Sequence, residues 1–305
     1  MTIFAFIGMC LAWGFSWIAM KFQVDSFLPP EISLFYRFFP VALIMTLLCL
    51  VTKKRLKPFK TEWRYFSAIA FCNFFLNFII GYHATKFIPS GMIAVIFSLT
   101  IITSEVIKAI FDKKKIEKKI ILGGLLGSIG LIFFLYPHLK LNVTNIDRII
   151  IGIVLGLIMM IIFSLGNYLV EKNKNHNHTP LFTAITFSAS LSSLYFLVLN
   201  LVIGHQFTMD YSAKYILSLL YQIFFSSIMA FICLYYLIQK IGSVRANFTA
   251  LIYPTIALIT SSFFENFNFT IFGTFGLILI IIAIAIEFLN INFIEKIKNV
   301  IKARI

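Results

Sequence analysis

Charged residues are scarce in this sequence. Asp, Glu, Lys and Arg make up 12% of its 305 residues, and only 12 residues are acidic. A typical soluble domain is about 25% charged. Hydrophobic residues instead account for 60% of the chain, and the mean hydropathy is +0.94. A soluble core does not need so much apolar surface, so the composition excludes a soluble globular protein and favours one that lives in a bilayer.

Several motifs that carry chemistry are also missing. The sequence contains no Walker A or Walker B motif, no H-E-x-x-H, no G-x-S-x-G and no pair of Asp residues within an apolar run. We therefore expect neither an ATP-driven pump by itself nor an enzyme, and no cofactor. His176 and His178 lack the further Cys, Asp or His ligands of a metal site, and no metal is expected.

Cysteine is rare as well. The four cysteines lie inside apolar runs and show neither a disulfide framework nor zinc-ligand spacing, so we expect buried, unpaired thiols. They are Cys10, Cys49, Cys72 and Cys233.

Long apolar runs recur along the whole chain. A membrane span needs about 20 apolar residues, and the runs predict an all-α integral membrane protein with ten transmembrane helices. The first run lacks the basic start and cleavage site of a secretory signal and is interpreted as a retained helix. The ten runs are Ile3–Lys21, Ile32–Val51, Tyr65–Tyr82, Ser90–Phe111, Ile120–Tyr136, Ile149–Leu169, Leu181–Ile203, Tyr215–Ile238, Val244–Phe264 and Ile271–Ile291.

The positive charge is distributed unevenly between the loops. The formal net charge is +14, and of the 26 Lys and Arg residues 19 fall in the even-numbered loops and at the C-terminus, against five in the odd-numbered loops. Basic clusters between apolar runs follow the positive-inside rule and do not form the basic face of a nucleic-acid-binding protein. We predict a multi-pass protein of the bacterial cytoplasmic (inner) membrane, with both termini in the cytoplasm and no nucleic-acid partner.

The second half of the chain repeats the first. Tyr82 corresponds to Tyr236 and Lys86 to Lys240, both at an offset of 154 residues. Five spans per half is an odd number, so the second half enters the membrane from the opposite side and the two repeats are inverted. We predict a first repeat over residues 1–137, a second over residues 149–292 and a basic cytoplasmic tail over residues 293–305. Inverted repeats are typical of secondary transporters, whose site lies where the halves meet.

Five short motifs follow one another in a fixed order along the chain. They are Trp13–Trp17, Arg37 with the apolar run after it, Gly81–Gly91, Ile121–Leu131 and Tyr253–Asn266. With these motifs the sequence, from Phe4 to about Ile286, resembles the EamA-type transporters of the drug/metabolite transporter superfamily. The resemblance implies proton-coupled or facilitated movement of small metabolites, often amino-acid export. One departure is that Thr100 stands where the second half has Pro254, which puts a kink in the fourth span in doubt.

Polar and aromatic side chains within the spans are the candidate substrate-binding residues. At membrane depth such groups face the bundle interior, a partner or an aqueous cavity. Trp13 and Trp17 share one helix face, as do Asn73 and Asn77, and each pair either lines a cavity or packs between helices. The remaining candidates are Asn167, Tyr168, Tyr221, Gln222 and Tyr253.

Four further residues are candidates for coupling or gating. Glu105 is the only acidic residue well inside a span, and either couples transport to a proton or pairs with Lys108. Arg37 either snorkels to the surface or gates the outer side by pairing with Asp25, Glu31 or Asp147. Pro254 frees a backbone carbonyl, which produces either a packing kink or a solute ligand. Glu171, at a span end, is expected to be solvated.

These observations favour a secondary transporter that moves small amphipathic metabolites, most plausibly amino acids or related amines, by alternating access, as an exporter or exchanger. A non-transporting receptor or lipid-handling subunit is the alternative, and an intramembrane enzyme is the least favoured. The expected partners are a small-molecule substrate, the lipid bilayer and a proton as the coupling ion. Gly123 and Gly127 form a G-x-x-x-G that predicts either close helix packing or dimerisation, so monomer and homodimer both stay open.

Overall fold

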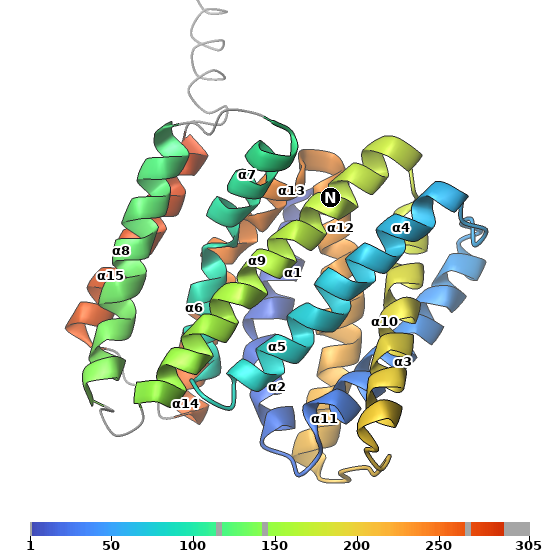
Figure 1. The fold of residues 1–305 in the computed structure, drawn as a ribbon, viewed down its shortest axis with the longest axis horizontal. Helices are drawn as coiled ribbons and strands as arrows, with labels where there is room; N and C mark the ends of the chain where they lie inside the picture. Colours follow the sequence, from blue (N-terminus) through green and yellow to red (C-terminus); the bar gives the residue numbers. More distant parts are fainter. Residues whose placement is uncertain (1, 114–117, 142–145, 266–269, 290–305) are drawn as a thin grey trace, which may run out of the picture.

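The computed structural model describes residues 2–113, 118–141, 146–265 and 270–289. Across these ranges the regular structure is entirely helical (Figure 1). The elements are α1 (Thr2–Gly14), α2 (Ser16–Val24), α3 (Pro30–Val51), α4 (Lys60–Ile69), η1 (Ala70–Leu76), α5 (Asn77–Ala84), α6 (Ser90–Ser98), α7 (Thr100–Phe111), α8 (Lys118–Leu141), α9 (Ile146–Asn177), α10 (Leu181–Ile203), α11 (Ala213–Tyr221), η3 (Gln222–Met229), α12 (Ala230–Ile241), α13 (Ser243–Ala246), η4 (Asn247–Leu251), α14 (Tyr253–Phe264) and α15 (Ile271–Leu289).

Each of the ten apolar runs overlaps a helical segment. Within the described ranges, six helices or continuous helix series are long and apolar enough to cross a membrane, and a bent pair, α6 with α7, makes a seventh candidate. The apolar parts of α8 and α15 are shorter, at Leu125–Pro137 and Ile271–Ala283. The protein is therefore a multi-pass helical membrane protein, whereas the count of ten spans and their inverted arrangement stay predictions.

The fourth run bends although it lacks a proline at the expected place. The axes of α6 and α7 differ by 40° across Leu99. The hydroxyl of Thr100 donates to the carbonyl of Phe97, and that of Thr103 donates to the carbonyls of Leu99 and Thr100. Threonine hydroxyls that bond the preceding turn compete with the helical ladder and bend it. The absence of a proline at Thr100 had put a kink in this span in doubt. That doubt was wrong: the span bends, and threonine hydroxyls account for the bend.

Two helices contain a π-helical segment in their middle. The segments are η1, between α4 and α5, and η3, between α11 and α12. They occupy matching places in the two halves, since residue 70 in the first corresponds to residue 224 in the second at the offset of 154. A π-helical turn leaves carbonyls out of the regular ladder and often marks a functional site.

The helices form a central bundle with one pair set to its side. In Figure 1 α8 and α15 lie together at the left, while α1, α9 and α12 occupy the middle. Glycine lets α8 and α15 approach closely: a Cβ on Gly276 would lie 2.4 Å from the backbone nitrogen of Phe134, and one on Gly130 would lie 2.7 Å from the carbonyl oxygen of Gly276. Gly123 and Gly127 also face α15 near Ala283, so the glycines of the G-x-x-x-G pack within the chain.

Candidate functional site

A small internal cavity lies in the centre of the bundle. Its volume is about 40 Å³, which is enough for on the order of one to three waters and too small for a metabolite. Side chains from α1, α2, α3, α5, α6, α9 and η3 surround it, so both halves of the chain contribute. The lining residues are Trp13, Ser16, Trp17, Met20, Arg37, Asn77, Phe78, Phe97, Met159, Phe163, Gln222 and Ser226.

Arg37 carries the only positive charge among the lining residues, and its side chain is buried. Its Nε donates to the hydroxyl of Ser227 at 2.8 Å, and its second terminal nitrogen donates to that of Ser226 at 3.0 Å. A longer contact of 3.5 Å reaches the hydroxyl of Tyr82, and the guanidinium lies 4.2 Å from the ring centre of Phe78. Arg37 therefore neither snorkels to the surface nor pairs with Asp25, Glu31 or Asp147 as an outer gate.

Two of the three acidic residues proposed as gate partners are engaged elsewhere. Glu31 pairs with His83 at 2.8 Å, and Asp25 pairs with Lys21 on the exposed surface. The two expectations for Arg37 failed for one physical reason. Ser226 and Ser227 on η3 are uncharged, but their hydroxyls accept hydrogen bonds from the guanidinium and hold it inside the bundle.

Three polar atoms at the cavity lack a partner among the described residues. They are Trp17 Nε1, Asn77 Oδ1 and Gln222 Oε1, and all three residues are buried. The Nε2 of Gln222 donates to the carbonyl of Ser16 at 2.7 Å, which fixes the orientation of its amide. Buried polar groups are nearly always hydrogen-bonded, so these three atoms, which packing covers here, require a partner that a ligand or water would supply.

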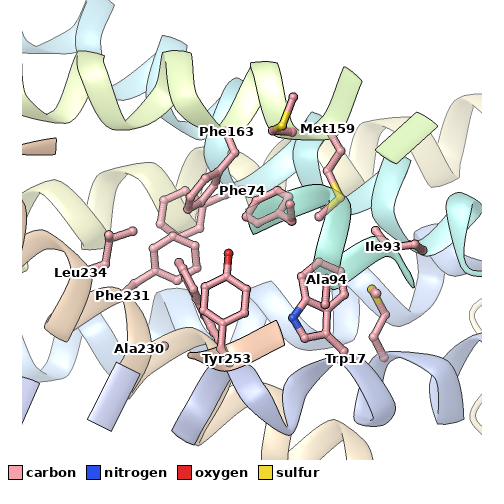
Figure 2. Packing of buried hydrophobic residues seen from close by; sticks show 14 of the residues in the cluster. Trp17, Phe74, Ile93, Ala94, Met159, Phe163, Ala230, Phe231, Leu234 and Tyr253 are labelled. Atoms are coloured by element: carbon pink, nitrogen blue, oxygen red, sulfur yellow. The ribbon is translucent and has the colours of Figure 1, made fainter. Parts of the chain in front are cut away.

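Aromatic rings form the apolar wall beside these groups. Figure 2 shows Trp17, Met159, Phe163 and Tyr253 around a common space. The ring of Trp13 meets those of Phe163 and Tyr253 edge to face, with centres 5.5 and 5.9 Å apart. Tyr253 is thus one layer behind the lining residues, where it supports Trp13.

Two predicted residues connect α1 with the helix that contains η3. The hydroxyl of Tyr221, the last residue of α11, donates to the carbonyl of Ala12 at 2.9 Å, and the indole of Trp13 donates to the carbonyl of Ser226 in η3 at 3.1 Å. The second bond gives a carbonyl of the π-helical segment a partner on α1. Tyr221 positions the site and does not line it.

A chain of buried amides crosses the bundle near the cavity. Asn73 donates to Asn167 at 3.0 Å, Asn167 donates to Asn247 at 3.0 Å, and Asn247 donates to Ser104 at 2.7 Å. These four residues come from η1, α9, η4 and α7. Asn73 and Asn167 therefore join helices of the two halves, while Asn77, one turn after Asn73, faces the cavity.

Tyr168 lies away from the cavity, at one end of the bundle. Its hydroxyl donates to Asp112 at 2.7 Å, and Lys172 pairs with the same carboxylate at 2.8 Å. Asp112 directly follows α7, and the hydrogen bond from Lys172 holds the pKa of its carboxyl below the usual value. Tyr168 is thus a contact between α9 and the end of α7.

The charged residues of α7 also lie outside the cavity lining. Lys108 forms an ion pair with Glu171 of α9 at 2.7 Å, and Glu105 is partly buried. Glu171 is not the solvated residue that was expected. It also accepts from the backbone nitrogen of Ser243 at 2.7 Å, which caps the first turn of α13 after Gly242, whose φ of +84° suits glycine.

A second carboxylate makes a similar contact at the other end of the bundle. Glu265, which follows α14, accepts from the backbone nitrogen of Ser90 at 3.0 Å and from its hydroxyl. Ser90 begins α6 as Ser243 begins α13, and the two serines are 153 residues apart. We call the contacts of Glu171 with Ser243 and of Glu265 with Ser90 the two carboxylate latches. Pro254 lies in the first turn of α14, after the 3₁₀ segment η4.

Sequence analysis missed several residues of the cavity wall. All are apolar side chains within predicted spans, and nothing in the local sequence separates a cavity side chain from a packed one; they are Met20, Phe78, Phe97, Met159 and Phe163. Ser226 had a signal, because it follows Gln222 by one helical turn.

Comparison with known proteins extends this description. A sequence model of the EamA-like transporter family matches residues 1–136 and 150–289. An uncharacterised transporter of Buchnera aphidicola subsp. Schlechtendalia chinensis is 26% identical over 262 residues, covering 85% of this chain and 83% of the relative. Another, from Buchnera aphidicola subsp. Schizaphis graminum, is 23% identical over 295 residues, covering 97% and 96%. A solved crystal structure shares the fold, with a TM-score of 0.67, 13% identity and coverage of 94% and 96%.

Proposed function

The chain belongs to the EamA-like transporter family, and we propose that it is a secondary transporter of small amphipathic metabolites, amino acids or related amines. It would work by alternating access in the bacterial cytoplasmic membrane, as an exporter or exchanger. The observation that carries the proposal is the central cavity, in which aromatic rings from both halves face unpartnered polar atoms. An amphipathic solute needs both kinds of surface.

The two carboxylate latches support alternating access. One lies at each end of the bundle, since α13 is at the top of Figure 1 and α14 runs to the bottom. The cavity between them has a volume of about 40 Å³, which is too small for a metabolite, so the site would have to widen to take one. Opening one end while the other latch holds would expose the site to a single face of the membrane.

The arrangement of helices supports two inverted repeats. Helices at matching positions of the two halves pack on each other, as α3 does on α10, α6 on α14 and α8 on α15. The uneven distribution of Lys and Arg favours both termini in the cytoplasm. Under this arrangement the spans number ten, and the basic tail of residues 293–305, which lies outside the described residues, faces the cytoplasm.

A proton is the proposed coupling ion, with Glu105 as its carrier. Glu105 is partly buried on α7, the same helix as Ser104, which ends the chain of buried amides. Ser104 is connected to η4 and, through Asn247, to α9, and we propose that a change of charge at the adjacent Glu105 alters how these elements pack. Gln at this position would keep the shape of the side chain and its hydrogen bonding while removing the charge.

Counterflow in proteoliposomes tests the proposed function. Vesicles preloaded with an unlabelled amino acid should accumulate the same labelled amino acid when they contain the protein, and protein-free vesicles should not. Asn77→Trp should abolish accumulation because the larger side chain fills the cavity, whereas Phe225→Trp, at an exposed position of η3, should not. A well-folded protein that binds solutes without counterflow would be a receptor and would refute the proposal.

A further inference from the structure

We propose that the solute carries a carboxylate and that Arg37 is its anchor in the central cavity. This inference rests on the proposed function and narrows it, because it selects amino acids and other carboxylates over amines that have no acidic group. Arg37 has a buried charge and unused donors, and residues with unpartnered polar atoms line the cavity beside it.

The charge of Arg37 is buried, and none of its contacts within the described part of the chain is a carboxylate. Its polar partners are the neutral hydroxyls of Ser226, Ser227 and Tyr82, and the faces of Phe38 and Phe78 cover the guanidinium. Moving a charge out of water costs several kcal/mol even after the protein relaxes. Neutral hydroxyls offset only part of that cost. An anion in the cavity would complete the neutralisation.

The guanidinium also has donors to spare. It has five N–H groups, and each of its three nitrogens makes one hydrogen bond to a hydroxyl. Two N–H groups on the terminal nitrogens are left, and Arg37 borders the cavity. Trp17 adds a further N–H that has no partner among the described residues and lines the same cavity. A planar carboxylate can accept from such a set of donors, which favours Arg over a point charge.

Acceptors complete the other side of the site. Asn77 and Gln222 line the cavity, their oxygens Oδ1 and Oε1 have no donor among the described residues, and the carbonyl of Ser16 fixes the orientation of the Gln222 amide. These oxygens can accept from an ammonium group. The site is therefore complementary to a zwitterion. Arg37 and Trp17 would bind the carboxylate, Asn77 and Gln222 would bind the ammonium group, and the aromatic wall would contact the apolar part.

The same charge discriminates against cationic solutes. An amine without a carboxylate would bring its positive charge beside that of Arg37, in a setting where water screens the repulsion poorly. Like charges brought together at low dielectric oppose binding and act as a specificity device. We therefore expect decarboxylated amines and C-terminal amides to be rejected.

Two methionines are suited to let the cavity widen around a solute. Met20 and Met159 line it, and a Cβ on Gly81 would lie 3.0 Å from the methyl group of Met159 and 3.8 Å from the sulfur of Met20. Methionine side chains are unbranched and repack readily. Their movement would enlarge the cavity without displacing Arg37, which is held by η3.

Ligand-dependent stability of the purified protein in lipid nanodiscs tests the anchor. The panel contains the common L-amino acids, their C-terminal amides, their decarboxylated amines and 3-phenylpropionate. We expect at least one free amino acid to raise the melting temperature, with its amide and its amine binding about tenfold or more weakly. Equal stabilisation by acid and amide, stabilisation by chloride alone, or no stabilisation by any carboxylate would overturn the anchor.

Variants of Arg37 separate an anchor from a structural residue. Arg37→Gln should remove the stabilisation by the carboxylate, while the unliganded variant melts at or above the wild-type temperature because it no longer buries a charge. Arg37→Lys should retain part of the response, and Arg245→Gln, at an exposed position, should retain all of it. A structural role predicts instead that unliganded Arg37→Gln loses stability while the folded fraction binds normally.

The results also distinguish this inference from the proposed function. Carboxylate-selective binding without counterflow would refute transport and leave the anchor standing. Counterflow of an amide at the rate of its acid would leave transport standing and refute the anchor.

Discussion

At the scale of single residues, the interior is held by contacts that leave no room for an added carbon. Gly166 of α9 packs directly against the amide of Asn73, so a Cβ at Gly166 would lie 1.8 Å from Asn73 Oδ1. That amide also donates to Asn167, the next residue on α9. The glycine is therefore what allows the chain of buried amides to connect η1 with α9.

We expect Gly166→Ala to destabilise the protein. The methyl group must displace the amide of Asn73, which breaks its hydrogen bond to Asn167, and overpacking of this kind costs about 1–3 kcal/mol. Thermal unfolding in detergent should show the loss. Gly8→Ala is the matched control, because a Cβ there would meet its nearest neighbour, the sulfur of Cys233, at an ordinary 3.6 Å.

A double variant checks the cause. If the amide of Asn73 is the obstacle, Asn73→Ala should cost less in the Gly166→Ala background than in the wild type, because neighbouring substitutions couple. A Gly166→Ala protein that unfolds like Gly8→Ala would contradict the explanation.

At the scale of helices, several elements are interrupted in mid-course, and the interruptions meet around the cavity. The segment η3 presents Gln222 and Ser226, the break between α1 and α2 adjoins Ser16, and Asn77 directly follows η1. An interrupted helix exposes backbone carbonyls that a regular helix would pair internally, and such carbonyls are tolerated at this depth only inside the protein or at a cavity. The site is thus built where helical regularity is given up.

The carboxylate latches are predicted to control access from the two ends. In a background without the native cysteines, Asn77→Cys should react with a membrane-impermeant thiol reagent faster when Glu265→Ala is added, from the face that carries the start of α6. Glu171→Ala should speed the reaction from the opposite face. We expect changes of about tenfold or more, since losing a hydrogen bond to a charged group costs about 1.5–3 kcal/mol.

Asp25→Ala is the control for this experiment. Asp25 pairs with Lys21 on the exposed surface, so its loss should leave the labelling rate unchanged. Equal acceleration from both faces by either latch variant would mean that the latches stabilise the whole bundle and do not act as gates.

At the scale of the whole molecule, the two halves share one interior, and the pair of α8 and α15 stands beside it (Figure 1). None of the described residues of this pair lines the cavity. Both helices are rich in aliphatic residues and glycine, as expected for helices that pack outside the cavity. Gly123 and Gly130 of α8 and Gly276 of α15 lie where the two helices pack against each other. A dimer through the Gly123 and Gly127 face would therefore have to replace an existing contact.

The orientation in the membrane is a prediction for the molecule as a whole. A cytoplasmic reporter fused after Ile305 should be active, and a reporter placed in the connection between α10 and α11, at residues 204–212, should read as external. The connection carries no Lys or Arg, whereas the C-terminal tail carries several. The reverse pair of signals would overturn the orientation.

Local composition alone determined where the helices lie and that they belong in a membrane. An apolar run of about 20 residues has few alternatives to a membrane helix, and each of the ten predicted runs, from Ile3–Lys21 onward, overlaps a helical segment. Helical spacing also identified Trp17, Asn77 and Gln222, because a polar or aromatic group at depth must turn away from lipid.

Tertiary structure alone decided what each inward group contacts. Trp13 and Trp17 share a face in the sequence, yet the indole of one is bonded to η3 while that of the other is unpartnered. Arg37 is held inside by hydroxyls 189 and 190 residues away, and Lys108 pairs with a carboxylate 63 residues away. Periodicity within one helix states which face is polar, but the partner of that face comes from another helix, and only packing brings the two together.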